Sequence, residues 1–217
     1  MPGSATAALL DRRPLELVVR AALGFGIALW LVARLSPQVL EALLRSYEQF
    51  VHLLDDHYRI GFTLTHQTGH DKIGGDLVVL GRAAVVKTFM IFTAEKTITL
   101  APGQVLTSST ATGVLMQPAT MILGLLLAWP LASAAEAAWR AALGAVMLVS
   151  WQLLGIPLSL WIYFRDIPLR AYAANELSWT TVVGKFLLNG GGVAVGAMLG
   201  FAIVLASRAA AGRLRRA

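Results

Sequence analysis

The chain has 217 residues, no cysteine and a formal net charge of +6; 57% of its residues are hydrophobic and 14% are charged. A soluble domain carries about 25% charged and about 45–50% apolar residues, so this apolar excess must be buried in lipid. The composition excludes a disordered, collagen-like or disulfide-stabilised chain. Because no thiol is present, it also excludes cysteine catalysis and thiolate metal or iron–sulfur sites. We expect an integral membrane protein without a cofactor.

The first apolar segment, from about Leu17 to Leu35, predicts a transmembrane helix. Its centre carries no charge, and Arg20 and Arg34 near its ends can extend toward the lipid headgroups. A cleaved signal peptide is the alternative interpretation. No clear small-x-small cleavage site follows, and a helical pattern begins at once, so we favour a retained anchor.

Residues 36–112 differ from the rest of the chain, because they hold all four histidines and seven of the twelve acidic residues. Ser36-Pro37 predicts a helix start, with an N-cap followed by proline at the first helical position. Apolar residues then recur at helical spacing, which predicts an amphipathic helix from Pro37 to about His57. These apolar positions are Leu40, Leu43, Leu44, Tyr47, Val51 and Leu54.

After this helix the apolar period changes to two, as in Ile60, Phe62 and Leu64. Three further β-rich runs follow, so we expect three or four short antiparallel strands connected in sequence. The polar segment Thr107–Thr110 is interpreted as the approach to the next helix. The β-rich runs are 59–65, 77–80, 85–92 and 96–100.

Three more apolar segments follow, at about 114–132, 141–164 and 186–206. Trp129-Pro130 closes the first of them at headgroup depth, and Gly155-x-Pro157 predicts a kink in the second. The predicted fold class is an α-helical integral membrane protein with four transmembrane helices and a small α+β extracytoplasmic domain between helices 1 and 2. The expected division is 1–35 for the N-terminus and first helix, 36–112 for the outer domain, 113–207 for a three-helix transmembrane bundle and 208–217 for a basic tail.

Basic residues in the short loops predict the orientation of the chain. Eight arginines lie on the side of the two termini and three basic residues lie on the other, so both termini are expected in the cytoplasm. The eight are Arg12, Arg13, Arg20, Arg140, Arg208, Arg213, Arg215 and Arg216; the three are Arg165, Arg170 and Lys185. The last four arginines, Arg208, Arg213, Arg215 and Arg216, are expected to contact anionic lipid headgroups. We expect no nucleic-acid binding, because this tail is short and lacks aromatic residues.

Histidine and carboxylate side chains together can bind zinc. Here one histidine pair is five residues apart, which splays the rings on a helix, and the other is four apart in a strand-like context. No His-Glu-x-x-His motif is present, so we predict no metal site. The residues concerned are His52, His57, His66 and His70, with Asp55, Asp56 and Asp71 among them.

A hydrolase or transferase at the membrane surface is an alternative function, using His66, His70 or Ser109. Ser109 lies just outside the second span, where a Ser–His pair, or a pair with Lys96, would suit such an enzyme. Neither a Gly-x-Ser-x-Gly elbow nor a Walker phosphate loop is present in the sequence. We therefore assign no catalytic residue.

Few polar residues fall within the spans. Ser150, Gln152 and Asn189 are the main ones; helix–helix hydrogen bonding is their default role. A transporter or channel component that uses Gln152 and Asn189 is the functional alternative. Gly192, Gly196 and Gly200 lie on one face of the last span, where a backbone can approach closely. That backbone belongs either to this chain's own spans or to a separate membrane protein. Arg165 and Asp166 are expected to form an exposed ion pair.

Three short stretches carry a family resemblance: Met116-Gln117-Pro118, Leu125–Pro130 and Val149–Gly155. With the order of the predicted parts, they make the chain look like the small membrane proteins encoded beside exosortases in Gram-negative bacteria. The resemblance implies a bacterial inner-membrane accessory protein that acts with a sorting enzyme and brings no catalytic residue of its own. The predicted function is thus a non-catalytic subunit that binds a partner membrane protein, or a second copy of itself, through its outer domain and its glycine-lined last helix.

Overall fold

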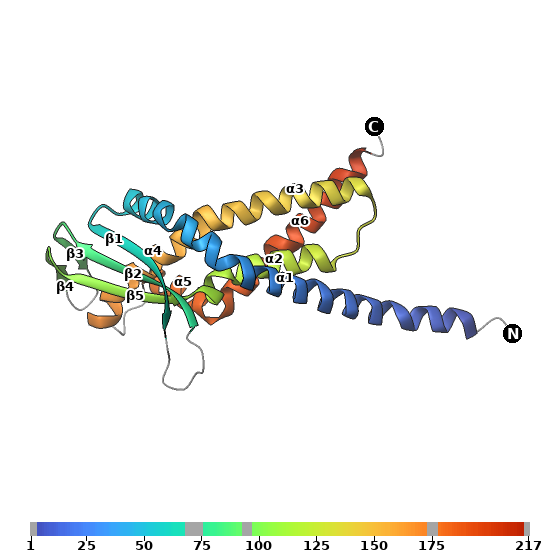
Figure 1. Ribbon diagram of the computed structural model, residues 1–217, viewed down its shortest axis with the longest axis horizontal. Coiled ribbons are helices and arrows are strands. Elements are labelled where there is room, and N and C mark those ends of the chain that lie inside the picture. The colour runs from blue at the N-terminus through green and yellow to red at the C-terminus, as the bar shows by residue number, and fades with distance from the viewer. Residues whose placement is uncertain (1–3, 68–75, 93–96, 173–177, 215–217) are drawn as a thin grey trace. The chain divides into compact units, whose positions relative to one another are not determined.

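The computed structural model describes residues 4–67, 76–92, 97–172 and 178–214, which form two compact units (Figure 1). The bundle unit comprises Met1–Arg34, Gln117–Val149 and Val193–Ala217. The sheet unit comprises Leu35–Met116 and Ser150–Gly192, so it also takes in residues that the sequence placed with the transmembrane bundle.

Among the described residues, three helical stretches are long and apolar enough to cross a bilayer: Leu15–Leu54, Ala134–Leu169 and Trp179–Arg213. The remaining apolar helix, α2 (Thr112–Ala128), is shorter. The protein is an integral membrane protein with three candidate spans and a small β-sheet region between its first two helices.

Helix α1 runs without a break from Ser4 to Leu54. The prediction of a new helix starting at Ser36-Pro37 is therefore wrong. An interior proline costs about 3 kcal/mol because it removes one backbone hydrogen bond. Fully buried side chains lie on both sides of Pro37 in this helix, Ala28 before it and Leu40 after it.

The described part of the chain contains five strands, where three or four were expected. β1 (Tyr58–Gln67), β2 (Asp76–Val85) and β5 (Val105–Ala111) form an antiparallel sheet in the order β1-β2-β5. β3 (Phe89–Phe92) and β4 (Thr97–Leu100) form a separate hairpin. Thr107–Thr110 is part of strand β5, which leads directly into α2, so the segment is both a strand and the predicted approach to a helix. β2 pairs with β1 and β5 and not with β3, the next strand in sequence.

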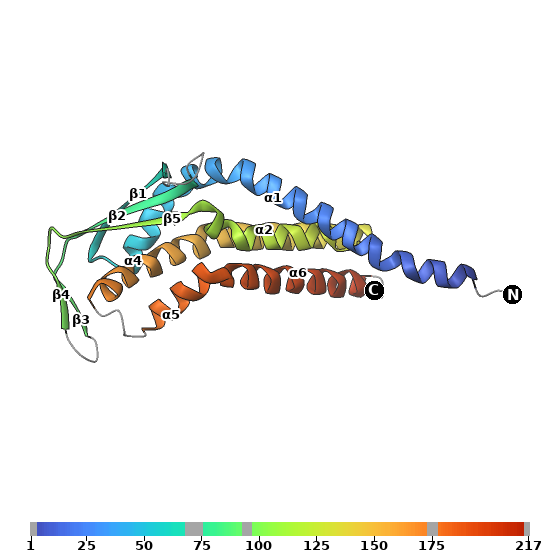
Figure 2. The same cartoon turned by 90° about the horizontal axis from the view of Figure 1, so that it is seen from below.

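One face of the three-stranded sheet is packed and the other is solvated. Figure 2 shows the sheet lying along α4 (Ile156–Tyr172), and the ring of Phe164 lies where a side chain at Gly81 would point. Phe62 on β1 is buried in the same layer, with its ring centre 5.9 Å from that of Phe164. The Phe62 N–H, on the outer edge of β1, donates to Glu48 of α1 at 2.8 Å.

Both long C-terminal helical stretches contain a π-helical turn. α3 (Ala134–Ser150) leads through Trp151–Gly155 into α4, and α5 (Trp179–Phe186) leads through Leu187–Gly191 into α6 (Gly192–Leu214). The first π-turn lies directly before Pro157, where the proline ring crowds the preceding turn, so the interruption falls at the predicted kink. In the second, Gly190 has a φ of +93°, which glycine adopts without strain.

In the bundle unit, close helix contacts are made at glycines. α2 lies against α1 at Gly24 and Gly124, against α3 at Gly144, and against α6 at Gly196 and Gly200. A helix that meets three neighbours in this way needs small residues at each crossing, because a side chain would hold the backbones apart.

Candidate functional site

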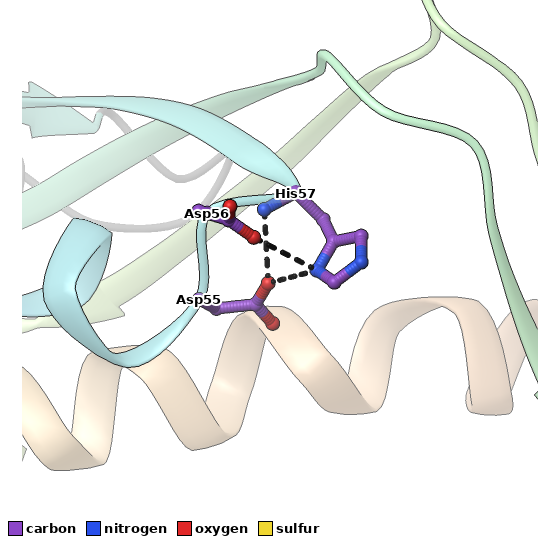
Figure 3. A group of neighbouring side chains, drawn as sticks. All are labelled: Asp55, Asp56 and His57. Atoms are coloured by element: carbon purple, nitrogen blue, oxygen red, sulfur yellow. Dashed lines mark hydrogen bonds and ion pairs between the residues drawn. The ribbon is translucent and has the colours of Figure 1, made fainter.

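Three consecutive residues between α1 and β1 form a cluster of metal-ligand side chains. Asp55, Asp56 and His57 each offer one ligand atom, and these atoms lie within 4.8 Å of one another (Figure 3). They are brought together by the turn after α1, in which the Asp55 N–H donates to the Val51 carbonyl at 2.9 Å. Sequence reasoning compared histidine spacings and did not single out this group, since a consecutive triplet has no periodic signal. These are the residues that could hold a divalent ion.

The two carboxylates already have cationic partners. Buried Asp55 lies 2.8 Å from His57 Nδ1, accepts the His57 backbone N–H at 3.1 Å, and lies 3.6 Å from Arg165 of α4. Asp56 pairs with Lys87, and this contact lowers the pKa of the Asp56 carboxyl. Because the pKa of Asp56 is lower in the folded than in the unfolded protein, the pair stabilises the fold at pH values above the unfolded-state pKa. This stabilisation is lost as the pH falls through the folded-state pKa. Charge balance here needs no metal, and the arrangement ties the turn after α1 to α4 and to Lys87.

An open groove of about 590 Å³ lies beside this cluster. Its lining includes Glu48 and His52 of α1, Asp56, Tyr58 and Lys87, a mixture of acidic and basic groups. Tyr58 is fully buried, and its hydroxyl has no hydrogen-bond partner within the described part of the chain. Burial raises the pKa of Tyr58, as does the Asp55 carboxylate, while Arg165 lowers it. The groove therefore favours no single class of ligand.

The structure does not bring the candidate catalytic residues His66 and Ser109 together. His66 on β1 pairs with Leu77 of β2, whereas Ser109 on β5 pairs with Leu80. Leu77 and Leu80 are three residues apart on one strand, so their side chains point to opposite faces of the sheet, and the two candidates do the same. His70 and Lys96 lie outside the described residues.

The polar candidates Gln152 and Asn189 both lie in π-helical turns. Gln152 lies in the turn before α4, where its side chain accepts from the Tyr47 hydroxyl at 3.3 Å and its amide contacts the Met116 sulfur at 3.4 Å. Asn189 lies in the turn before α6, with non-helical backbone angles. Gln152 therefore joins two neighbouring elements of the sheet unit, in keeping with the hydrogen-bonding role that is the default for such residues.

Two members of the glycine series pack against this chain's own α2. A side chain at Gly196 would come within 2.6 Å of the Pro118 backbone, and one at Gly200 within 2.7 Å of the Leu125 side chain. Gly192 is also buried. The sequence left open whether this face packs against the chain's own spans or against a separate protein. In this structure Gly196 and Gly200 pack against the chain's own α2, so a partner would have to bind elsewhere.

A second polar cluster, which sequence reasoning missed, lies in the bundle unit. Arg140 was expected in a loop, but it lies on α3 and is buried. It pairs with Glu136 and donates to the Trp129 carbonyl at 2.6 Å. Arg208 of α6 also pairs with Glu136, at 3.1 Å, so it does more than reach for lipid. Arg213 is exposed, while Arg215 and Arg216 lie outside the described residues. The signal available in the sequence was the four-residue spacing of Glu136 and Arg140.

The expected exposed ion pair between Arg165 and Asp166 is not what the structure shows. Asp166 is fully buried and accepts a hydrogen bond from the Thr181 hydroxyl of α5, while Arg165 faces Asp55. Consecutive helical residues point in directions about 100° apart, so neighbours in sequence face different partners.

Comparison of the chain with protein-family models, curated proteins and solved structures found no significant match.

Proposed function

We propose that the chain is a non-catalytic subunit that binds a partner membrane protein through its outer segment, residues 36–112. The observation that carries the proposal is the outward face of the β3–β4 hairpin, where Met90 is 56% and Phe92 is 78% exposed. Large apolar side chains grouped on an exposed face are typical of interaction surfaces.

Strand register supports a two-sided hairpin. Met90 pairs with Thr99 and Phe92 with Thr97, so these four side chains share one face. On the other face Ile98 and Leu100 are buried, and Phe89 packs edge-on against Tyr58 with ring centres 5.1 Å apart. The inner face thus fixes the hairpin to the sheet unit and leaves the outer face for a partner.

The finer parts of the proposal follow from the sequence. The balance of basic residues near the ends of the spans favours cytoplasmic termini, with eight arginines against three basic residues. The family resemblance favours a bacterial inner membrane and a sorting enzyme as the partner. The glycines of α6 are not part of the proposed surface, since α2 covers Gly196 and Gly200.

Replacing Met90 and Phe92 together by serine is expected to abolish co-purification of the partner from native membranes in mild detergent, without lowering the thermal stability of the subunit. Both side chains are exposed, so their loss removes apolar contact area from the complex and little from the fold. Thr99→Ser, on the same face, is the matched control and should retain the partner. If the double variant still co-purifies with the partner, the proposal is contradicted. If the wild type is a dimer and the double variant is a monomer, the partner is a second copy of this chain.

A transporter or channel component is a second candidate, favoured by the π-helical turns at Gln152 and Asn189. Interrupted membrane helices expose backbone groups that can bind ions or substrates. If this candidate is right, proteoliposomes carry water or ions faster than protein-free vesicles, and Asn189→Ala slows them. Ser46→Ala, outside these turns, is the control. Equal flux with and without protein contradicts this candidate and leaves the subunit proposal untouched.

A further inference from the structure

A hollow of about 280 Å³ lies between the start of α3 and the last turns of α6, within the bundle unit. Figure 1 shows the connection from α2 to α3 beside the end of α6. Small residues make the space, and two charged groups border it. The lining consists of Ala132, Ser133, Glu136, Arg208, Ala211 and Gly212.

The charge around this hollow is positive. Two guanidinium groups, of Arg140 and Arg208, share the single carboxylate of Glu136, which also accepts the Ala132 N–H at 3.0 Å. One positive charge is therefore left over. Arg208 carries it outward, because Arg140 is buried and Arg208 is 41% exposed.

The position of Arg208 is fixed by its contacts. Its Nε lies 3.1 Å from Glu136, another nitrogen donates to the Pro130 carbonyl at 3.2 Å, and the guanidinium lies over the Trp129 ring at 5.7 Å. A guanidinium held in this way loses little freedom when an anion binds. The first turn of α3, which begins beside Ser133, adds the positive end of a helix dipole.

The surroundings of the hollow match the headgroup layer of a bilayer. Tryptophan is enriched at this depth, and Trp129 follows directly after the end of α2. Leu131, next to the lining residue Ala132, is 55% exposed, as is expected where acyl chains cover the surface. A phospholipid fits both features, because its phosphate is an anion that can meet Arg208 and its acyl chains can lie along the apolar border.

We infer that the hollow between α3 and α6 binds the headgroup of an anionic phospholipid, with Arg208 contacting its phosphate. The site goes beyond the proposed function and is independent of it, since it lies in the bundle unit and not on the hairpin. Arg208, expected from the sequence to meet lipid in general, thereby gains one defined lipid position next to Glu136.

The test adds a large side chain at a lining position of the hollow without changing any charge. Gly212 lines the space, and an added Cβ there meets no atom within 4 Å, so Gly212→Leu is accommodated. Gly26 of α1 is equally open, and Gly26→Leu is the matched control. Each protein is purified in a neutral detergent and titrated with phosphatidylglycerol or phosphatidylcholine, and the melting temperature is followed. Inorganic phosphate at matched ionic strength forms a separate arm.

For the wild type and Gly26→Leu we expect a saturable rise of the melting temperature with phosphatidylglycerol and a much smaller rise with phosphatidylcholine. Gly212→Leu should need about tenfold more phosphatidylglycerol, the equivalent of one lost charge-assisted hydrogen bond. Gly212→Ala should fall between them, which keeps the test valid if the leucine variant folds poorly. Equal titrations of wild type, Gly212→Ala and Gly212→Leu would overturn the inference, as would an equal response to inorganic phosphate.

Discussion

Leucine in place of Gly196 is expected to destabilise the protein by about 3 kcal/mol, the upper end of the usual cost of overpacking. The added Cβ would lie 2.6 Å from both the Cα and the carbonyl oxygen of Pro118 and 2.7 Å from the Cβ of Met121. These atoms belong to the main chain or are bonded directly to it. They cannot rotate out of the way, as the end of a flexible side chain could. α6 must therefore move off α2. Thermal unfolding in detergent, followed by size-exclusion chromatography, should show a melting temperature lower by about 10 °C.

The control for this experiment is Gly26→Leu, the same substitution on a helix face where no atom lies within 4 Å. It adds a leucine to a surface that already carries exposed Ile27 and Leu29, so the melting temperature should change little. If Gly196→Leu and Gly26→Leu have the same melting temperature, the close approach of α6 to α2 is incorrect. The face of α6 that carries Gly196 and Gly200 would then again be available to a partner.

Methionine in place of Arg140 is expected to cost about 2–3 kcal/mol, because a buried carboxylate loses one charge-assisted hydrogen bond and a buried carbonyl loses its donor. Glu136, which is almost fully buried, would keep Arg208 and the Ala132 N–H as partners and lose Arg140. The carbonyl of Trp129, near the end of α2, would also lose its donor. The measured quantity is again the melting temperature in detergent, with the fraction of protein that elutes as a single species.

Glu16 and Arg20 provide the matched comparison, because they form the same Glu–Arg pair four residues apart on α1, but in an exposed position. Arg20→Met should cost less than about 1 kcal/mol. Adding Glu136→Gln to Arg140→Met should lower the melting temperature further, because Arg208 then loses the carboxylate with which it pairs. Equal melting temperatures for Arg20→Met and Arg140→Met would show that Glu136 and Arg140 are not buried together.

The features predicted well from the sequence are those set by a local pattern. Apolar stretches of sufficient length led to the membrane assignment, and alternation at Ile60, Phe62 and Leu64 led to β1. The Gly155-x-Pro157 motif led to an interruption of the third span, because the effect of proline on a helix acts within one turn.

The features missed depend on contacts between distant residues. Pro37 has the local signature of a helix start, yet α1 continues through it, with buried residues on both sides. β5 is polar and short, and it is recognised as a strand only through its pairing with β2. Arg140 and Asp166 resemble surface charges in sequence, but the structure buries them with partners from outside their own helices, the Trp129 carbonyl for Arg140 and the Thr181 hydroxyl for Asp166.

The same dependence limited the candidate sites. The histidines were judged by their separation along the chain, whereas the turn after α1 brings Asp55 and His57 into contact across two residues. His66 and Ser109 both fitted an enzyme by residue type, and only the strand register separates them. For the glycines, the spacing showed that a backbone approaches α6, and the structure shows that the backbone is that of α2.

The hydrogen bond from the Phe62 N–H to Glu48 has a consequence for aggregation. An outer strand with unpaired backbone groups is a template on which another chain can extend a sheet. On β1 the Glu48 carboxylate already accepts the Phe62 N–H in the middle of the strand. A strand that pairs with β1 would have to displace this carboxylate, which would then lose its hydrogen bond. Copies of this protein crowded in a detergent micelle are thereby discouraged from joining through β1 into fibrous, β-rich material.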